Sequence, residues 1–296
     1  MGDDDTGPTY TVAICNYEMA DTLAESLESI VSQLDDRFEV VVVDDGSEDG
    51  SLEILREFAA RYENFRFHEE DNDNLAEARN SSFRHADGTY VLESLDVDDR
   101  YEPIIQDFTD LFHRFDSVLD GPFYLWGRGI NMAHRELLLE VPYRSLGYGE
   151  DKDFWRRLLA QDQIVFLDHE LPCESIGYDR DNRTLLSMWL ELAKVDFQTG
   201  ITLQSFISFN LRELLRAKFK DRREAAFNLV SWPLSYWQAR SDVQYDPVPG
   251  YRSYGRMEQE IDRRKRTAMG HAAAMGFDLE PDNFSDAGRR IFLFGR

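Results

Sequence analysis

Short apolar runs alternate with helical patterns between residues 10 and 100. Four runs have the length and the β-branched content of strands, at residues 10–15, 39–43, 65–68 and 89–92. Apolar residues recur at helical spacing from Leu23 to Leu34, and residues 75–85 form another helical pattern. This alternation is typical of βαβ units. It predicts an α/β fold with a mostly parallel central sheet and flanking helices.

Beyond residue 100 the pattern is mixed and then becomes helical. We expect a helix over residues 104–115, strands at 123–126 and 164–167, and a helix that begins at Glu150. From about residue 185 the pattern is helical and irregular, and Pro233 predicts a break into two short helical pieces. We therefore expect an α/β domain at residues 1–180 and a helical C-terminal extension at residues 181–296.

The chain is strongly acidic, with 57 Asp and Glu against 33 Lys and Arg and a net charge of −24. Such acidity, with few Lys among the cations, keeps a protein hydrated at high salt and resembles the composition of halophilic proteins. A duplex nucleic acid is excluded as a partner, because phosphate binding needs a basic surface. Residues 212–296 reverse the balance, with 16 cations to 12 acids, which indicates a different neighbour for the tail.

Targeting signals are absent from the sequence. The N-terminus has neither the basic nor the apolar region of a signal peptide, and no uncharged apolar run reaches the ~18 to 20 residues of a membrane span. Cys15 and Cys173 have no metal-type spacing and fit a reducing compartment. We therefore expect a cytoplasmic protein that does not cross a membrane.

A basic cluster in the tail precedes an aromatic segment that ends at Trp237. Its members are Arg212, Arg216, Lys218, Lys220, Arg222 and Arg223. Cations beside Trp and Tyr suit the anionic inner face of the cell membrane, where the segment would lie as a peripheral contact. The same cations could pair with the acidic domain, and the sequence favours neither alternative.

Acidic residues follow two of the predicted strands. Asp96 and Asp98 form a D-x-D pair after the fourth strand, and Asp44 and Asp45 follow the second. Ligands of open α/β sheets bind at this edge, where paired carboxylates can hold a divalent cation against a diphosphate. Asp44 or Asp45 could equally cap the following helix. Since no glycine-rich phosphate loop occurs, a metal ion is expected to bind the phosphates.

The order of several motifs resembles that of a family 2 glycosyltransferase of the GT-A fold. The motifs, over roughly residues 9–180, are ICNYE, SLESIVSQ, FEVVVVDDGSEDGS, NLAEARNSS, GTYVLESLDVDD and GYGEDKDFWRRL. The resemblance implies a nucleoside-diphosphate-sugar donor, Mg²⁺ or Mn²⁺, and inversion at the anomeric carbon. It assigns residues 1–180 to the nucleotide-sugar glycosyltransferase domain and leaves the acceptor open, as a lipid-linked phosphate, a glycan or a protein.

The resemblance also implies the roles of particular residues. The donor would be bound by Asn16, Tyr17, Glu18, Asp44, Asp45, Arg79, Asn80, Asp96 and Val97, with Asp96 and Asp98 as metal ligands. Asp151 would be the catalytic base, with Glu150 beside it in the E-D motif. The sequence departs from the family pattern in two places. Glu18 occupies a position where the family often has Asn, and the stretch from residue 99 to 150 is short for the family.

Other interpretations remain open at this stage. A sugar-phosphate nucleotidyltransferase would also use acidic metal ligands, but the glycine-rich loop usual near its first strand is absent. An inactive nucleotide-sugar-binding module is disfavoured, because every D-x-D and E-D position is acidic. Acids at a helix start, such as Asp151, are also common structural residues. His169 is a candidate metal ligand or a structural histidine, and Trp126 with residues 127–129 could line a sugar pocket or the core.

Overall fold

The computed structural model describes residues 7–177, 185–216 and 219–293. Within them the chain forms two compact units. The first comprises Met1–Pro142, Gln163–Tyr178 and Lys265–Arg296, and the second Tyr143–Asp162 and Asp179–Arg264. The expected boundary at residue 180 falls outside the described residues and stays a prediction.

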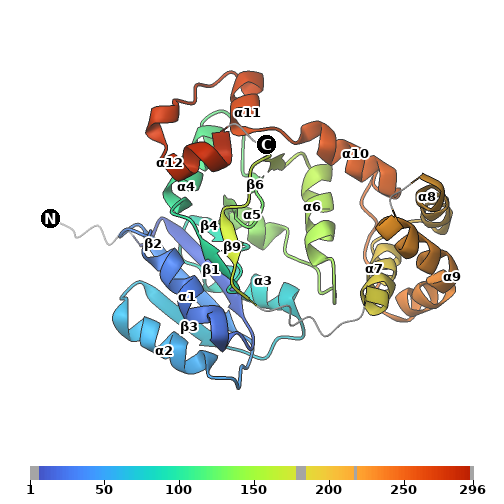
Figure 1. Ribbon diagram of the computed structural model, residues 1–296, viewed down its shortest axis with the longest axis horizontal. Coiled ribbons are helices and arrows are strands. Elements are labelled where there is room, and N and C mark those ends of the chain that lie inside the picture. Colours follow the sequence, from blue (N-terminus) through green and yellow to red (C-terminus); the bar gives the residue numbers. More distant parts are fainter. Residues whose placement is uncertain (1–6, 178–184, 217–218, 294–296) are drawn as a thin grey trace. The chain divides into compact units, whose positions relative to one another are not determined.

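A seven-stranded sheet forms the centre of the first unit (Figure 1). Its strands are β3 (Phe65–Glu69), β2 (Phe38–Asp44), β1 (Tyr10–Asn16), β4 (Tyr90–Glu93), β7 (Asn131–His134), β6 (Tyr124–Trp126) and β8 (Ile164–Phe166), in spatial order. Strand β7 is antiparallel to β4 and β6, and all other pairs are parallel. This arrangement confirms the predicted α/β fold with a mostly parallel sheet.

Helices cover both faces of this sheet, which explains the continuous Val run of β2. All seven residues of β2 are buried. Val40 and Val42 belong to a core that includes residues of α1 (Ala20–Val31), α2 (Ser51–Arg61) and α4 (Ile105–Asp116). Val41 and Val43 point to the opposite face, because side chains alternate along a strand. Helices α3 (Leu75–His85) and α5 (Arg135–Glu140) pack together, and α3 contacts β1 and β2.

A second, two-stranded sheet lies beside the acidic motif. It pairs β5 (Asp99–Tyr101) with β9 (Cys173–Ser175) in antiparallel fashion. The pairing joins segments more than 70 residues apart in the sequence, and it fixes the loop that carries the D-x-D pair.

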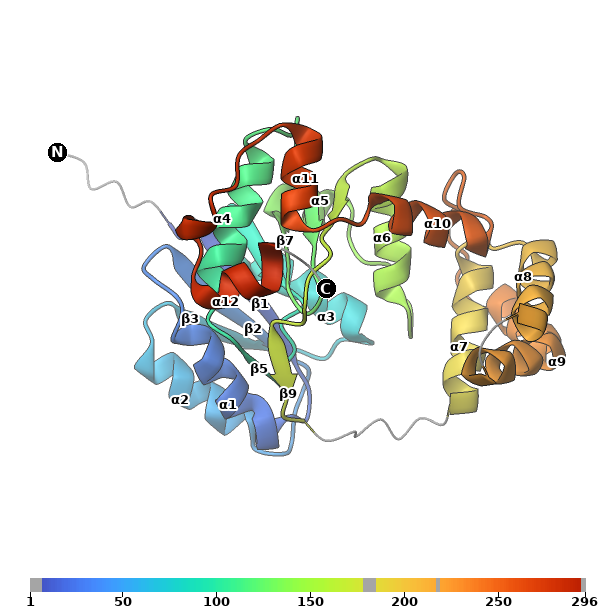
Figure 2. The ribbon, with the colours of Figure 1, turned by 45° about the horizontal axis from the view of Figure 1, so that its top comes forward.

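The last described residues return to the first unit. Arg266 forms a bridge with Leu167, and α11 (Ala268–Met275), α12 (Asp286–Gly288) and the final turn, Arg289–Leu293, follow (Figure 2). The backbone N–H of Ser285 donates to Asp107 of α4 at 2.9 Å, and residues 291–293 are fully buried. Residues 266–293 therefore contribute to the core of the sheet domain.

The second unit is helical, as predicted for the C-terminal region. It contains α6 (Glu150–Ala160), α7 (Leu185–Gln198), α8 (Leu203–Arg216), α9 (Phe219–Ser241) and α10 (Tyr254–Arg264). The predicted break at Pro233 is wrong, since α9 runs unbroken through this residue. Proline removes one helical hydrogen bond, and the packing of buried Ala225 and Ala239 among α7 and α8 offsets that loss. None of the helices in the described ranges has the length and apolar character needed to span a bilayer.

Candidate functional site

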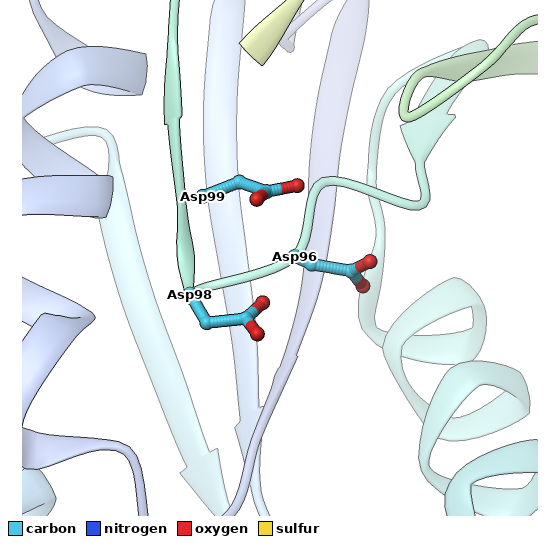
Figure 3. Close-up of side chains that lie close together, drawn as sticks. All are labelled: Asp96, Asp98 and Asp99. Carbon is cyan, nitrogen blue, oxygen red and sulfur yellow. The ribbon is translucent and has the colours of Figure 1, made fainter. Parts of the chain in front are cut away.

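Three carboxylates gather at the end of β4. One ligand oxygen each from Asp96, Asp98 and Asp99 lies within 4.8 Å of the others. Figure 3 shows the side chains of Asp98 and Asp99 pointing towards the loop that carries Asp96. Opposite oxygen ligands of Mg²⁺ are about 4.2 Å apart, so small side-chain movements would close this cluster around such a cation. The donor set, three carboxylates, is the kind that hard divalent cations prefer.

The Asp96 carboxyl group reaches solvent, but protein atoms crowd around it. This desolvation raises the pKa of Asp96 to about 6; the Arg79 charge opposes the rise, and Asp98 and Asp99 add to it. Burial likewise raises the pKa of Asp99, and a hydrogen bond from the Cys173 thiol, at 3.1 Å, opposes that rise. In both groups desolvation is the main cause, and the neighbouring acids add to it, so a bound cation would favour the charged form of these carboxylates.

Arg79 and Asp96 line one small cavity at this edge of the sheet. The cavity, of about 40 Å³, also contacts Cys15 and Glu93. Burial raises the pKa of Cys15 to about 12, so its thiol is protonated at neutral pH. The arrangement places one guanidinium near Asp96 of the acidic cluster, which is suitable for a diphosphate bound to a cation. Asn80 follows Arg79 on α3 and is half-buried.

The predicted nucleoside residues divide into buried and accessible ones. Asp44 is fully buried, and its carboxylate accepts from the Asn16 amide at 2.6 Å and from the Ser47 backbone N–H at 2.9 Å. These bonds shape the turn after β2 and leave Asp44 a structural role in the loop. Asp45 is partly exposed and accepts from the Asn72 N–H at 2.7 Å, while Tyr17 is 61% exposed. Of this group, Asp45 and Tyr17 are the ones a ligand can reach.

Glu18 adopts a left-handed backbone conformation with φ 55°. Asn tolerates this conformation better than Glu, which is a physical reason for the Asn that the family resemblance implies at this position. Here the Glu18 carboxylate accepts from the Glu48 N–H at 2.7 Å, and the Glu18 N–H donates to Ser47 at 2.9 Å. Glu18 therefore closes the loop between the ends of β1 and β2. Val97 is 5% exposed and packs in the core, so only its backbone could meet a ligand.

Gly177 holds the acidic loop by close contact with Asp98. Its N–H donates to the Asp98 carbonyl at 2.9 Å, and an added Cβ would lie 2.5 Å from the Asp98 Cβ.

We expect Gly177→Ala to displace the Asp98 carboxylate and to weaken Mn²⁺-dependent nucleotide binding by about 10- to 100-fold, as is usual for supports of metal ligands. Calorimetric titration measures this. Gly7→Ala, where nothing lies within 4 Å, is the control, and equal affinities in both variants would contradict the expectation.

The acids at the start of α6 have different environments. Asp153 is buried and forms ion pairs with Arg144 and Arg157, which makes it structural. Asp151 is partly exposed, and its Oδ1 accepts from the Lys152 N–H at 2.7 Å. Glu150, also partly exposed, is the first residue of the helix. The carboxylate of Asp151 thus stays accessible at a helix N-terminus, where a negative charge is stabilised.

His169 is a structural histidine. It is 1% exposed, its Nε2 accepts from the Arg128 N–H at 2.8 Å, and its Nδ1 bonds to the Glu170 carbonyl. Burial lowers the pKa of His169 to about 4, so the ring is neutral at physiological pH. Both nitrogens are occupied, which favours the structural alternative over the metal-ligand one. Trp126 contacts Phe166 and lies under the Lys265 ammonium, and the glycines at 127 and 129 form the tight turn between β6 and β7.

Three residues at this site were not predicted from the sequence. Asp99 is the third carboxylate and Cys173 donates to it, while Gly177 supports Asp98. Asp99 directly follows the D-x-D pair, so the run of three acids in four residues was an available signal. The sequence carries no signal for Cys173 and Gly177, because only the pairing of β5 with β9 brings these residues to the acidic loop.

Comparison with known proteins defines the class of this chain. The sequence profile of glycosyl transferase family 2 matches residues 11–166, which is more than half of the chain. The chain belongs to this family.

Individual relatives agree with this assignment. The cholesterol galactosyltransferase of Borreliella burgdorferi is 30% identical over 153 residues, which are 50% of this chain and 41% of that protein. In another curated relative the matched stretch is only 14% of its length. This chain therefore spans less than half the length of the curated relatives that it matches.

Two solved structures share the fold. S. aureus TarS 1-349 has a TM-score of 0.52 and 17% identity, covering 92% of this chain and 93% of that chain. Glucosyl-3-phosphoglycerate synthase from Mycobacterium tuberculosis, in complex with Mn²⁺, uridine diphosphate and glucosyl-3-phosphoglycerate, has a TM-score of 0.50 and 18% identity, covering 64% and 77%. These likenesses confirm the predicted GT-A fold.

Proposed function

We propose that the protein is an inverting glycosyltransferase that moves a sugar from a nucleoside-diphosphate sugar to an acceptor hydroxyl, with Mg²⁺ or Mn²⁺ bound. The observation that carries this is the cluster of Asp96, Asp98 and Asp99, with Arg79 beside Asp96. Membership of the family supports it. A fold neighbour solved with Mn²⁺ and uridine diphosphate supports the cofactor and the donor type.

The chemistry of the acidic cluster follows from the leaving group. Displacement at the anomeric carbon leaves negative charge on the nucleoside diphosphate, and a divalent cation neutralises that charge when bound. Asp96, Asp98 and Asp99 would hold the cation, while the Arg79 guanidinium would orient the diphosphate oxygens through charge-assisted hydrogen bonds. Tyr17 and Asp45 would contact the nucleoside from the loops after β1 and β2.

Asp151 is our candidate for the catalytic base. In a single displacement the acceptor oxygen bonds to the anomeric carbon as the bond to the diphosphate oxygen breaks, and the acceptor proton passes to a carboxylate. An accessible Asp at a helix start can accept that proton. Glu150, one residue earlier, is the second candidate.

We further propose that the tail brings the enzyme to a lipid-linked acceptor at the membrane surface. Exposed apolar residues of α8 and α9 support this: Leu215 is 77% exposed, Val230 82% and Trp237 66%. Arg212, Arg216, Arg222 and Arg223 lie on the same two helices. Lys218 of the predicted cluster lies outside the described residues, as does the side chain of Lys220.

Co-sedimentation with anionic liposomes tests the membrane contact. Each cation near an anionic surface contributes ~1 kcal/mol at modest salt. We therefore expect binding at low salt that weakens, without vanishing, at high salt, since Trp237 and its apolar neighbours are insensitive to screening. Trp237→Ser should remove the salt-resistant part. A protein that stays in the supernatant at both salt concentrations would instead assign the tail to protein contacts.

We also propose that the protein works at high salt, as in a halophile, because acids outnumber cations by 57 to 33. Binding of the donor should therefore be measured in concentrated KCl.

Calorimetric titration of UDP, GDP and CDP, each with and without Mn²⁺, would identify the nucleotide. The proposal expects one nucleotide to bind only with the metal present. A nucleotide that binds equally well in a chelator would contradict metal-assisted binding.

A further inference from the structure

We propose that Asn131 of β7 is a positioning residue, which clamps the start of the acidic loop so that Asp96 and Asp98 stay within reach of one cation. Because Asn131 acts on the proposed metal site, this role rests on the proposed function. It adds a residue far outside the acidic motif on which metal-dependent donor binding depends.

The acidic loop starts with a left-handed residue. Ser94 directly follows Glu93, the last residue of β4, and has φ 61°. A serine in this region of backbone space is strained, and it keeps the conformation only where its surroundings hold it. Ser94 lines the same small cavity as Arg79 and Asp96, so the backbone at this turn sets where the loop leaves the sheet for the metal site.

The side-chain amide of Asn131 provides a restraint at this turn. Its nitrogen donates to the Ser94 Oγ at 2.8 Å and to the Glu93 Oε1 at 2.9 Å, and its Oδ1 accepts from the Gly127 N–H at 2.9 Å. A backbone N–H can only donate, so the amide oxygen has to face Gly127 and the nitrogen faces Ser94 and Glu93. Asn131 is 3% exposed, where little water competes for these bonds.

Three central strands hold the amide in place. Asn131 is paired with Glu93 across β4 and β7 and with Trp126 across β6 and β7. Residues opposite each other in a sheet have their side chains on the same face, which is why the amide meets the Glu93 carboxylate. The hydroxyl of Tyr124, a buried residue of β6, donates to the same Glu93 oxygen. The clamp is thus built on rigid elements, as a positioning group requires.

The rest of the acidic loop, shown in Figure 3, has restraints of its own. The Asp96 N–H donates to the Tyr101 hydroxyl at 2.7 Å, and the Asp98 carbonyl accepts from the N–H groups of residues 176 and 177 at 2.8 and 2.9 Å. These bonds restrain the loop from residue 96 onward, whereas the bond from Asn131 restrains its first turn. Loss of that bond frees the strained turn to relax and moves the Asp96 carboxylate.

Titration of the full chain with Mn²⁺ alone, followed by electron paramagnetic resonance, tests this role without any assay of transfer. Asn131→Leu keeps a similar shape but cannot donate, and should weaken Mn²⁺ binding about ten-fold or more. Ser94→Ala removes the acceptor of the same bond at a partly exposed position and should also weaken binding, so the clamp is tested even if Asn131→Leu does not fold. Adding Ser94→Gly to Asn131→Leu should recover most of the affinity, because glycine adopts the left-handed conformation without strain.

Thr109→Val is the matched control. Thr109 is 1% exposed, and its hydroxyl donates at 2.9 Å to the Ile105 carbonyl of its own helix, α4. This variant also loses a buried hydrogen bond, but its Mn²⁺ affinity should equal that of the wild type even where its melting temperature falls. A purely structural role for Asn131 would make the two variants behave alike.

Hydrogen exchange in the absence of metal separates this role from the proposed function. Asn131→Leu and Ser94→Ala should speed amide exchange at residues 94–99, and Thr109→Val should not. A wild type that binds no Mn²⁺ would contradict the proposed metal site, while the exchange rates would still decide whether Asn131 holds the loop. The positioning role is overturned if Ser94→Ala binds Mn²⁺ like the wild type, if Thr109→Val loses as much affinity as Asn131→Leu, or if exchange at residues 94–99 is unchanged.

Discussion

Replacement of Asp151 by Asn lowers the rate of sugar transfer by about 10²- to 10⁴-fold while the affinity for the nucleotide is retained. The reason is that an amide of the same shape cannot take the acceptor proton, and general-base help is typically of this size. Transfer kinetics and calorimetric donor binding, measured on the same preparation, separate the two effects.

Asp262→Asn is the matched control, because Asp262 is an exposed acid on α10 in the same unit. Its transfer rate should equal that of the wild type. If Asp151→Asn keeps its rate within a few-fold, Asp151 serves the helix N-terminus only. Glu150→Gln then tests whether the neighbouring carboxylate takes the proton.

Replacement of Asp98 or Asp96 by Ala abolishes Mn²⁺-dependent nucleotide binding and leaves the fold intact. Loss of one carboxylate leaves two acids to hold the cation, too few to anchor a diphosphate that carries its own negative charge. The fold should survive in Asp98→Ala because that side chain is partly exposed, and in Asp96→Ala because the folded-state pKa of Asp96 is raised to about 6. An Asp with a raised pKa destabilises the folded state increasingly as pH rises from its ordinary pKa to 6, so removal of its charge at neutral pH costs no electrostatic stability.

Calorimetry and thermal melting together check this prediction. Asp36→Ala removes an exposed acid far along the chain from the cluster and should bind nucleotide normally. Wild-type affinity in both Asp96→Ala and Asp98→Ala would exclude these residues from the metal site. A collapse of the melting temperature in either variant would show that the carboxylate serves the fold instead.

The strongly patterned elements could be predicted from the sequence, because burial imposes the pattern. The β-branched run at residues 39–43 predicts a strand covered on both faces, and β2 has all its residues buried. The helical pattern at residues 75–85 agrees with the bounds of α3. Strands β5, β7 and β9 escaped prediction: each has only three or four residues, and β5 and β9 pair with each other across more than 70 residues of sequence.

The acidic pair itself was visible in the sequence, but its surroundings were not. Asp96 and Asp98 follow a strand, as the D-x-D motif indicated, and Arg79 lines a cavity with Asp96. The contacts of Asp98 with Gly177, and of Asp99 with Cys173, depend on a strand pairing across more than 70 residues. The unbroken helix through Pro233 was missed because packing of α9 against α7 and α8 overrides the local preference of proline.

Hydrolysis of nucleotide sugars without an acceptor tests the central claim most directly. A transferase that binds donor and metal slowly passes the sugar to water, so no acceptor has to be known. With a panel of UDP-, GDP- and CDP-sugars in concentrated KCl, the account predicts release of one nucleoside diphosphate that requires Mn²⁺ or Mg²⁺, stops with EDTA and is lost in Asp98→Ala. Release that continues in EDTA, or that persists in Asp98→Ala, would contradict it.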